Sequence, residues 1–268
     1  MSKKNLLILS NTQKSDLSIG DYLRILSFLP NLKFKNIYFL DDPLLRPLVQ
    51  EYNFIKIIKN IHEINKNDFF KFNLYEKKKN NFNEFYLDNL LEKKINIKKN
   101  MSDIHSKLSL FFKIKNYKIF HPQKKNLKIH NKIFFSCYAP NKWKIKEYPV
   151  DKWKELEKLL IKNNNIFPKY QEKNSNLEHF IKDIKESEIV ISIVNLGCHI
   201  ANMFSKKLIM LSGSNYHTES IKEKNQITIF PVTKCKFRPC NLPRGKENCG
   251  CMPDISVNEI YENIKKIL

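Results

Sequence analysis

The feature that most constrains the fold is the alternation of apolar runs with amphipathic helices in the second half of the chain. Runs typical of buried strands lie at 132–138, 165–170, 188–194, 207–211 and 226–232. Helical periodicity lies at 150–160, 177–186, 199–204 and 257–268. Strands that are apolar on both faces and alternate with helices are typical of a parallel sheet covered on both sides. The pattern therefore predicts a Rossmann-like half.

The first half begins in the same way and then loses its periodicity. Strands are expected at 5–10, 36–40 and 54–58, with one helix from about residue 21 and another after residue 43. From 65 to 130 the chain is rich in Lys and Asn, and we expect helices joined by solvated loops there. The predicted domains are 1–125, Rossmann-like and on the acceptor side, and 126–268, Rossmann-like and on the nucleotide side. Two such halves imply a central cleft, with ligands at the carboxyl ends of the strands.

Composition excludes several classes of protein. With 42% hydrophobic and 12% aromatic residues, the chain has ample apolar surface for a folded core and is not intrinsically disordered. No apolar run approaches the roughly 20 residues of a membrane-spanning helix, and the apolar run near the start is too short for a signal peptide. We therefore expect a cytoplasmic protein.

The net charge of +21 has two interpretations. A basic surface attracts the phosphates of a nucleic acid or of an anionic membrane. Alternatively, a genome biased towards A and T places Lys on every solvated face, which fits a chain with only four arginines. Because Arg reads phosphates and bases better than Lys does, and no nucleic-acid-binding motif is present, we expect no nucleic-acid partner. Peripheral contact with an anionic membrane, at its inner face, stays open.

Glycine is scarce, so each of the five glycines is informative. Under such a bias a glycine persists where a side chain would not fit, and we expect this of all five. Three of them follow expected strands. The five are Gly20, Gly197, Gly213, Gly245 and Gly250.

Gly20 and Asp21 stand where a polar loop leads from the first strand into a helix. The carboxylate of Asp21 has two interpretations: it caps the helix, or it acts as a general base on an acceptor hydroxyl. In the second half, Gly197 is expected to make the turn after the strand at 188–194, and His199 to open the next helix. The N-terminus of such a helix suits a diphosphate, whereas His199 alone is equally compatible with a structural role.

Ser212 and Gly213 end the next strand in the same way. One strand that ends in a glycine turn is weak evidence for a ligand site. Two consecutive strands with such ends favour adjacent walls of a nucleotide pocket.

Four of the six cysteines fall in one loop: Cys235, Cys240, Cys249 and Cys251. Because disulfides are disfavoured in a cytoplasmic chain, we expect either one metal ion held by four thiolates or four free thiols. The spacing C-x4-C-x8-C-x-C is not that of a zinc ribbon. Gly250 would let the sulfurs on either side of it turn to one ion, and thiolate ligation suits Zn or Fe.

The order of these motifs resembles glycosyltransferase family 9, the heptosyltransferase family. The matching features are Gly20-Asp21 with an apolar helix ending in Leu-Pro, APNKWKIKEYPVDKWKELEKLL, a strand-Gly-x-His-helix, a Lys-Leu-Ile strand ending in Ser-Gly, and CMPDISVNEIYENI. The match is strongest over 132–268, is supported at 5–30 and is absent at 60–120. SGSNYHTES and the cysteines look most like the autotransporter heptosyltransferase branch, whose members carry a cysteine-bound iron. The resemblance implies a GT-B-like α/β fold with a central cleft and a reduced N-terminal half.

Carried over onto this sequence, the family pattern implies a role for each motif. Asp21 would be the base of an inverting transfer, and the four cysteines would hold a structural Fe or Zn ion. At 195–199 the sequence departs from the family, which has Asp in place of Asn195 and two residues rather than one between Gly and His. The implied donor-binding positions are Gly20, Lys142, Asn195, Gly197, His199, Ser212, Gly213, Thr218 and Glu219.

The resulting hypothesis is a glycosyltransferase that moves a sugar from a nucleotide diphosphate, with ADP-heptose the favoured donor, to a glycan such as lipopolysaccharide core or to a protein. Helix N–H groups and Lys142 would stabilise the leaving diphosphate, so that catalysis needs neither a metal nor an organic cofactor. Two alternatives stay open. One is an inactive GT-B-like binding protein, and the other is a basic nucleic-acid-binding protein with a four-cysteine metal site.

Overall fold

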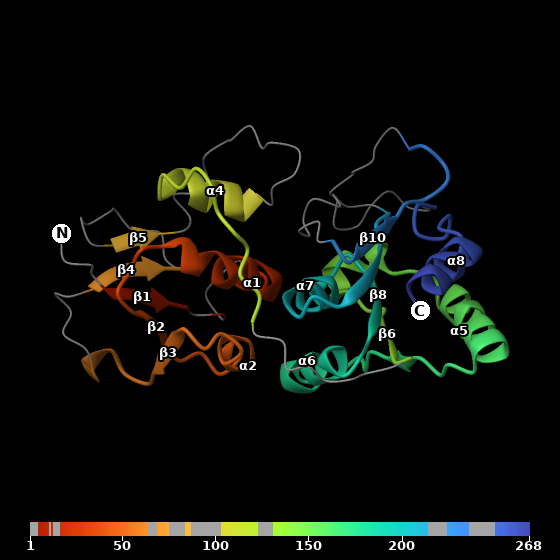
Figure 1. The fold of residues 1–268 in the computed structure, drawn as a ribbon, viewed down its shortest axis with the longest axis horizontal. Coiled ribbons are helices and arrows are strands. Elements are labelled where there is room, and N and C mark those ends of the chain that lie inside the picture. Colours follow the sequence, from red (N-terminus) through yellow and green to blue (C-terminus); the bar gives the residue numbers. More distant parts are fainter. Residues whose placement is uncertain are drawn as a thin grey trace. The chain divides into compact units, whose positions relative to one another are not determined.

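Two compact units make up the chain, Met1–Pro122 and Gln123–Leu268. The structure is a computed structural model that describes residues 5–10, 12, 17–63, 69–74, 84–86, 103–122, 131–213, 224–235 and 250–268. Each unit contains a five-stranded sheet whose strands all run parallel, with helices around it (Figure 1). The predicted α/β class is therefore confirmed.

The first unit has the strand order β3-β2-β1-β4-β5. Its strands are β1 (Asn5–Leu9), β2 (Ile37–Leu40), β3 (Ile55–Ile58), β4 (Phe69–Asn73) and β5 (Glu84–Tyr86). Its helices are α1 (Ile19–Phe28), η1 (Leu29–Asn31), α2 (Arg46–Val49), η2 (Ile61–Glu63) and α4 (Asp103–Phe111). Helices α1 and α4 pack against each other.

Strands β4 and β5 lie in the segment where we expected only helices and loops, so that expectation is wrong. β4 pairs with β1 along its whole length, from Asn5 opposite Phe69 to Leu9 opposite Asn73. The sequence FFKFN gives a weak strand signal because Lys71 interrupts its apolar run and polar residues flank it. The described part of 65–130 also contains α4, a helix of the kind that we expected there.

The second unit has the strand order β10-β9-β8-β6-β7. Its strands are β6 (Ile133–Ser136), β7 (Lys169–Tyr170), β8 (Ile189–Ile193), β9 (Lys207–Leu211) and β10 (Gln226–Ile229). Its helices are η4 (Asn141–Lys146), α5 (Val150–Asn164), α6 (Leu177–Lys185), α7 (Leu196–Met203) and α8 (Val257–Ile267). Every strand and helix that the periodicity predicts in this half is present.

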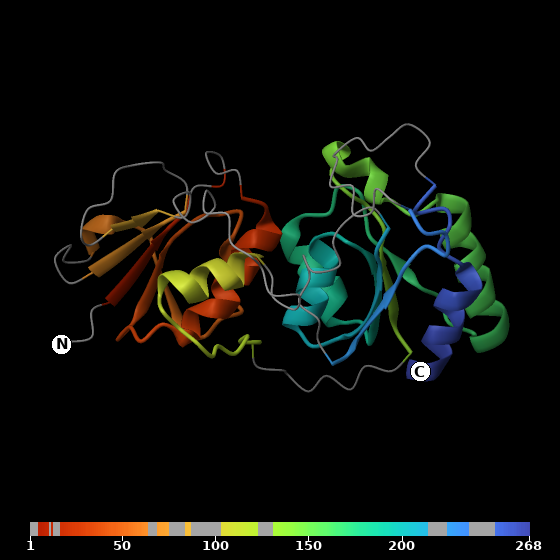
Figure 2. The same ribbon diagram turned by 90° about the horizontal axis from the view of Figure 1, so that it is seen from above.

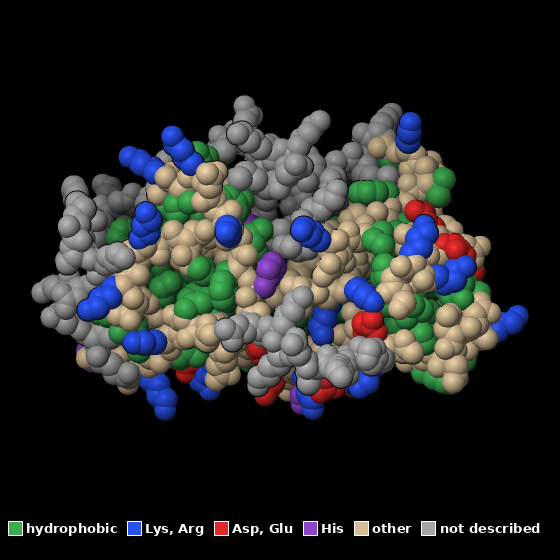
Figure 3. Space-filling view, in the orientation of Figure 1, with side chains coloured by type: hydrophobic (Ala, Val, Ile, Leu, Met, Phe, Trp, Pro, Cys, Tyr) green, Lys and Arg blue, Asp and Glu red, His purple; other side chains and the backbone are tan. Residues whose placement is uncertain are grey.

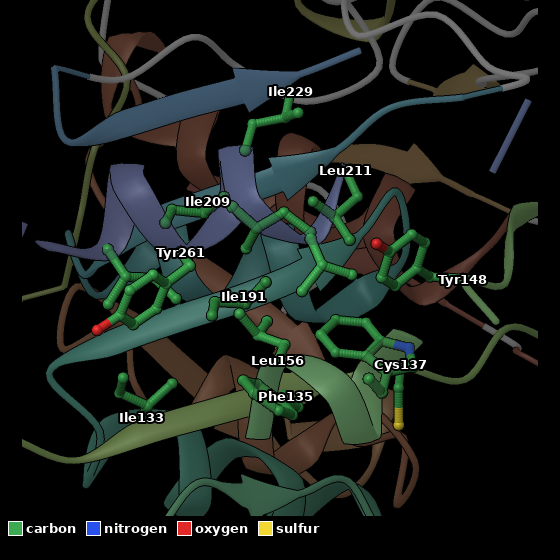
Figure 4. Close-up of a cluster of buried hydrophobic side chains, with 14 of the residues drawn as sticks. Ile133, Phe135, Cys137, Tyr148, Leu156, Ile191, Ile209, Leu211, Ile229 and Tyr261 are labelled. Atoms are coloured by element: carbon green, nitrogen blue, oxygen red, sulfur yellow. The ribbon is translucent and has the colours of Figure 1, made fainter. Parts of the chain in front are cut away.

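Helices cover both faces of the second sheet, with α5 and α8 on one side and α6 and α7 on the other (Figure 2). All five residues of β8 are buried, as a central strand between two helix layers requires. The hydrophobic core under α5 and α8 is formed by alternate residues of neighbouring strands. Ile191, Ile209, Leu211 and Ile229 lie there together with Leu156 and Tyr261 (Figure 4).

The two helices over this core are amphipathic. Spacings of three and four residues place their buried side chains on one stripe. The buried residues are Trp153, Leu156 and Leu160 of α5, and Val257, Ile260, Tyr261 and Ile264 of α8. Within the described residues, no helix combines the length and the hydropathy needed to cross a membrane.

Candidate functional site

A topological switch point lies between β6 and β8 of the second unit. After β6 the chain adds β7 on one side, and then crosses over to add β8, β9 and β10 on the other. Helices α5 and α7, which follow β6 and β8, therefore start from adjacent strand ends and run on opposite faces of the sheet. Open parallel sheets bind ligands at such a point. Ser136 ends β6, and Asn195 comes two residues after the end of β8.

The side chain of Asn195 joins these two strand ends. Its Nδ2 donates to Ser136 Oγ (2.9 Å) and to the carbonyl oxygen of Tyr138 (2.9 Å). Its Oδ1 accepts from Ser192 Oγ (2.8 Å) and from the backbone N–H of Gly197 (2.7 Å), which caps α7. Both donors and both lone pairs of the amide are thereby used. Asn195 fixes the start of α7 against β6.

Gln171, which the sequence interpretation missed, holds the same loop from the other side. It follows the edge strand β7, and its backbone N–H donates to the carbonyl oxygen of Phe135 (2.9 Å). Its Oε1 accepts from Tyr138 N (3.2 Å) and from Ser136 Oγ (3.2 Å). The Tyr138 peptide is thus held at its N–H by Gln171 and at its carbonyl by Asn195. No local sequence pattern marks Gln171, because its partners are some 35 residues away.

Gly197 lies inside α7 rather than in a turn before it, so the expected turn role is wrong. Glycine is required here because the helix approaches β6 closely. A Cβ on residue 197 would lie 2.2 Å from Ser136 Oγ and 2.6 Å from Ser136 Cβ. The expectation that no side chain fits is confirmed at Gly197. At Gly250 it is wrong, because no described atom beyond its chain neighbours lies within 4 Å of the added Cβ.

The first turn of α7 begins at the switch point, so its backbone N–H groups face the carboxyl end of the sheet. Such N–H groups, together with the helix dipole, attract anions. Cys198 is fully buried and donates its Sγ–H to the carbonyl oxygen of Asn195 (2.8 Å). His199 is half-buried in the same turn. The structure therefore brings Asn195, Gly197 and His199 together at the carboxyl end of the sheet.

Ser212 and Gly213 follow directly after β9, the neighbour of β8. Ser212 is fully buried, and its N–H donates to the carbonyl oxygen of Ile229 (2.9 Å), which extends the pairing of β9 with β10. A Cβ on residue 213 would lie 2.4 Å from Met252 Sδ, so this turn packs against the chain beyond the cysteine loop. Outside the described residues lie Thr218 and Glu219.

Lys142 belongs to η4, which begins after the loop that follows β6. The structure describes the backbone of Lys142 and not its side chain. Glu147 ties this segment to the end of β6, since its Oε1 accepts from Ala139 N (3.0 Å). Lys146 Nζ lies 4.6 Å from the centre of the Trp143 ring. The segment therefore brings basic side chains to the carboxyl side of β6.

Burial keeps two titratable groups of this edge neutral. It raises the pKa of Cys137 to about 11, so the thiol packs as a core residue at neutral pH. It also raises the pKa of Tyr170, whose hydroxyl donates to Glu157 Oε2 (3.1 Å). Neither group is a nucleophile at neutral pH.

In the first unit, Asp21 forms a capping box at the start of α1. Its Oδ2 accepts from the backbone N–H of Ser18 (2.8 Å) and from Ser18 Oγ (2.7 Å), while its own N–H donates to Ser18 Oγ (3.3 Å). Its Oδ1 pairs with the guanidinium of Arg24, and its side chain is 18% exposed. Gly20 precedes it and is buried. The capping interpretation of Asp21 is confirmed, and the role as a base stays a prediction.

Cys235 and Cys251 stand near the two ends of the cysteine-rich segment. The ends are joined beside them, because the N–H of Thr233 donates to Asp254 Oδ2 (2.6 Å). Neither of these two cysteines forms a disulfide. Outside the described residues lie Cys240 and Cys249. Among the residues that are described, no group of three or more His, Cys, Asp or Glu is arranged to hold a metal ion, and the four-cysteine site stays a prediction.

Comparison with known proteins supports the fold. No protein-family model and no curated protein sequence matches the chain. Solved structures do match, among them a family 9 glycosyltransferase from Veillonella parvula, with a TM-score of 0.68, 10% identity, and coverage of 98% of this chain and 96% of that one.

Two further structures come from Escherichia coli. The ADP-heptose lipopolysaccharide heptosyltransferase II matches with a TM-score of 0.66 and 12% identity over 98% of both chains. The iron-containing dodecameric glycosyltransferase TibC matches with a TM-score of 0.64 and 10% identity, over 98% of this chain and 76% of that one. At these identities the likeness concerns the fold, and it confirms the GT-B-like architecture and the resemblance in fold to family 9.

Proposed function

We propose that this chain is a glycosyltransferase that transfers a sugar from a nucleotide diphosphate, with ADP-heptose the favoured donor, to a glycan or protein acceptor. Solved structures with the same fold support this, since they include heptosyltransferases in complex with ADP-D-β-D-heptose and with ADP. The observation that carries the proposal is the arrangement at the switch point, where two strand ends, the start of α7 and a glycine that tolerates no side chain meet.

The donor diphosphate is assigned to the first turn of α7. The N–H groups and partial positive charge of that turn offset the negative charge that develops on the leaving diphosphate. His199 projects from this turn and is assigned to the same donor. The other donor-binding positions in the proposal are Gly20, Lys142, Ser212, Gly213, Thr218 and Glu219.

Asn195 is assigned a positioning role rather than a direct contact with the sugar. Its amide is already bonded to Ser136, Tyr138, Ser192 and Gly197, which leaves it no free donor. An Asp at this position would lose both Nδ2 donors. The departure of the sequence from the family signature is therefore matched by hydrogen bonds that only an amide makes.

In the chemical step, the acceptor hydroxyl oxygen attacks the anomeric carbon from the face opposite the diphosphate. The new C–O bond forms as the bond between the anomeric carbon and the diphosphate oxygen breaks, so the configuration inverts. The carboxylate of Asp21 takes the proton of the hydroxyl. In this scheme the ion pair with Arg24 holds the carboxylate in place.

A structural metal ion on Cys235, Cys240, Cys249 and Cys251 is part of the proposal. The two described members, Cys235 and Cys251, fit such a site, because the Thr233–Asp254 hydrogen bond brings the two ends of their loop together. Four thiolates suit Fe or Zn. When bound, the ion would cross-link this loop.

The proposal is tested by comparing Asp21→Asn with Ser18→Ala, a matched control at the same cap. Both variants lose a partner of the capping box, at a cost of about 1 kcal/mol in stability. Only Asp21→Asn removes the proposed base, and it should lower kcat by about 10²–10⁴-fold. Turnover is measured as nucleoside diphosphate released from ADP-, UDP- and GDP-sugars, and affinity for ADP by calorimetry.

The expected result is that both variants bind ADP as the wild type does, and that Ser18→Ala keeps its turnover within a few-fold. Equal loss of turnover in the two variants would mean that Asp21 acts only as a cap. A folded wild type that binds ADP but turns over no sugar nucleotide would identify an inactive binding protein. Failure to bind any nucleotide would overturn the proposal as a whole.

A further inference from the structure

A basic surface of the first unit is built from two segments that lie far apart in the sequence. One segment, 29–36, contains η1 and leads into β2, and the other, 104–122, contains most of α4 and the chain after it. Asn31 joins them, since its Nδ2 donates to the carbonyl oxygen of Lys118 (2.8 Å) and its Oδ1 accepts from Lys118 N (2.9 Å). These paired bonds make the two segments one surface.

Both segments expose lysines and contain no Asp or Glu. Exposed lysines alternate with apolar residues that are at least half-buried, such as Phe34 and Ile114, so that the ammonium groups face solvent. No ion pair with a described acid is recorded for these lysines. We call this surface the lysine face. Its five exposed lysines are Lys33, Lys35, Lys113, Lys115 and Lys118.

In the second unit, several lysines form ion pairs with acidic side chains. Several of them lie within 4.0 Å of a carboxylate oxygen, so that their charges are locally offset. A bias of the genome towards Lys raises the number of lysines but does not by itself remove acids from one surface. The pairs are Lys169 with Asp183, Lys182 with Glu186, Lys207 with Glu188 and Lys265 with Glu262.

An exposed apolar side chain stands within the lysine face. Leu110, in the last turn of α4, is 59% exposed, and its carbonyl oxygen accepts from the N–H of Lys113 (3.2 Å). Figure 3 shows Lys and Arg side chains around hydrophobic ones over α4 and its surroundings. Lysines around an exposed leucine suit a lipid interface, because the leucine enters the headgroup region while the ammonium groups pair with phosphates. Arg, the better reader of nucleic acid, is absent from both segments.

We propose that the lysine face docks the first unit onto an anionic phospholipid bilayer. The face adjoins the end of α1, whereas Asp21 lies in its first turn. At 1.5 Å per residue, Phe28 at the end of α1 is about 10 Å along the helix axis from Asp21, and the lysine face begins beyond it. Substitutions on the face therefore leave the proposed base intact, and the proposal stands independently of the glycosyl transfer.

The test compares two variants of equal net charge. The first replaces the five lysines of the lysine face by Gln. The control replaces five exposed lysines of the second unit by Gln: Lys154, Lys158, Lys162, Lys173 and Lys266. Each protein is sedimented with vesicles of phosphatidylcholine, alone or with phosphatidylglycerol, at 0.1 and 0.5 M salt, and circular dichroism checks that both variants fold.

The wild type should bind only the vesicles that contain phosphatidylglycerol, and more weakly at 0.5 M salt. At about fivefold per lysine, the face variant should bind at least a hundredfold more weakly, while the control changes by less than tenfold. Equal losses of vesicle binding in the two variants would mean that net charge alone causes binding, and would overturn the proposal. The proposal is also overturned if the wild type does not bind the vesicles that contain phosphatidylglycerol. The same holds if the wild type binds a 20-nucleotide RNA instead of these vesicles and the face variant no longer binds that RNA.

Discussion

The contact between Gly197 and Ser136 makes a quantitative prediction for Gly197→Ala. The new methyl would lie 2.2 Å from Ser136 Oγ and 2.6 Å from its Cβ, and Ser136 is fully buried. Overpacking of this kind costs about 1–3 kcal/mol. Displacement of Ser136 weakens its hydrogen bonds to Gln171 and Asn195, at about 1 kcal/mol each. Alanine returns up to about 1 kcal/mol of helix propensity, so we expect a net loss of about 2–4 kcal/mol.

The measurement is urea unfolding followed by tryptophan fluorescence. Both tryptophans, Trp143 and Trp153, lie in the second unit, so the signal reports the unit that contains the substitution. Gly250→Ala is the matched control in the same unit. Because no described atom beyond its chain neighbours lies within 4 Å of a Cβ there, we expect a change of no more than about 0.5 kcal/mol.

A double-mutant cycle completes the experiment. Ser136→Gly removes both atoms that the new methyl would strike, so Gly197→Ala should cost about 1.5 kcal/mol less in that background than in the wild type. The steric reasoning is refuted if Gly197→Ala is no more destabilising than Gly250→Ala. It is refuted equally if Ser136→Gly gives no relief.

Two further predictions concern other parts of the chain. Burial lowers the pKa of His105 to about 4; since an exposed His titrates near 6.5, stability present above pH 6.5 should be lost as the pH falls towards 4, by about 3 kcal/mol. The free energy of unfolding, measured by circular dichroism during urea unfolding at several pH values, should fall in this way in the wild type and less steeply in His105→Gln. An equal dependence on pH in the two proteins would contradict the prediction. Elemental analysis of protein purified without added metal should find one Fe or Zn per chain, which Cys235→Ser loses and Cys137→Ser keeps. Equal metal content in the two variants would speak against the cysteine site.

The alternating architecture was predictable from the sequence because strands that are buried on both faces of a parallel sheet are continuous apolar runs. The run at 188–194 is β8, which the structure buries completely. β4 was not predictable, since its position beside β1 depends on long-range pairing and its short sequence contains Lys71. A strand of this kind is set by its neighbours rather than by its own composition.

The candidate site was predictable in position but not in detail. Asn195, Gly197 and His199 follow the central strand, so the sequence order places them at the sheet edge. Ser136, which bonds to Asn195, lies in β6, and Gln171, which bonds to Ser136, follows β7; neither shows a motif of its own. The reason for glycine at 197 is likewise a tertiary contact rather than a turn.

The late position of α8 has a consequence for synthesis on the ribosome. The core under α5 needs Ile260 and Ile264 of α8, and Tyr148 donates to the carbonyl oxygen of Ile255 just before that helix (2.9 Å). At about 5–20 residues per second, the chain between β6 and α8 takes about 6–24 s to make. Until α8 is added, the part of this sheet face that α8 covers stays exposed in the nascent second unit, whereas all residues of the first unit have already been added. Completion of this core, and with it the burial of that face, therefore waits for the last helix of the second unit.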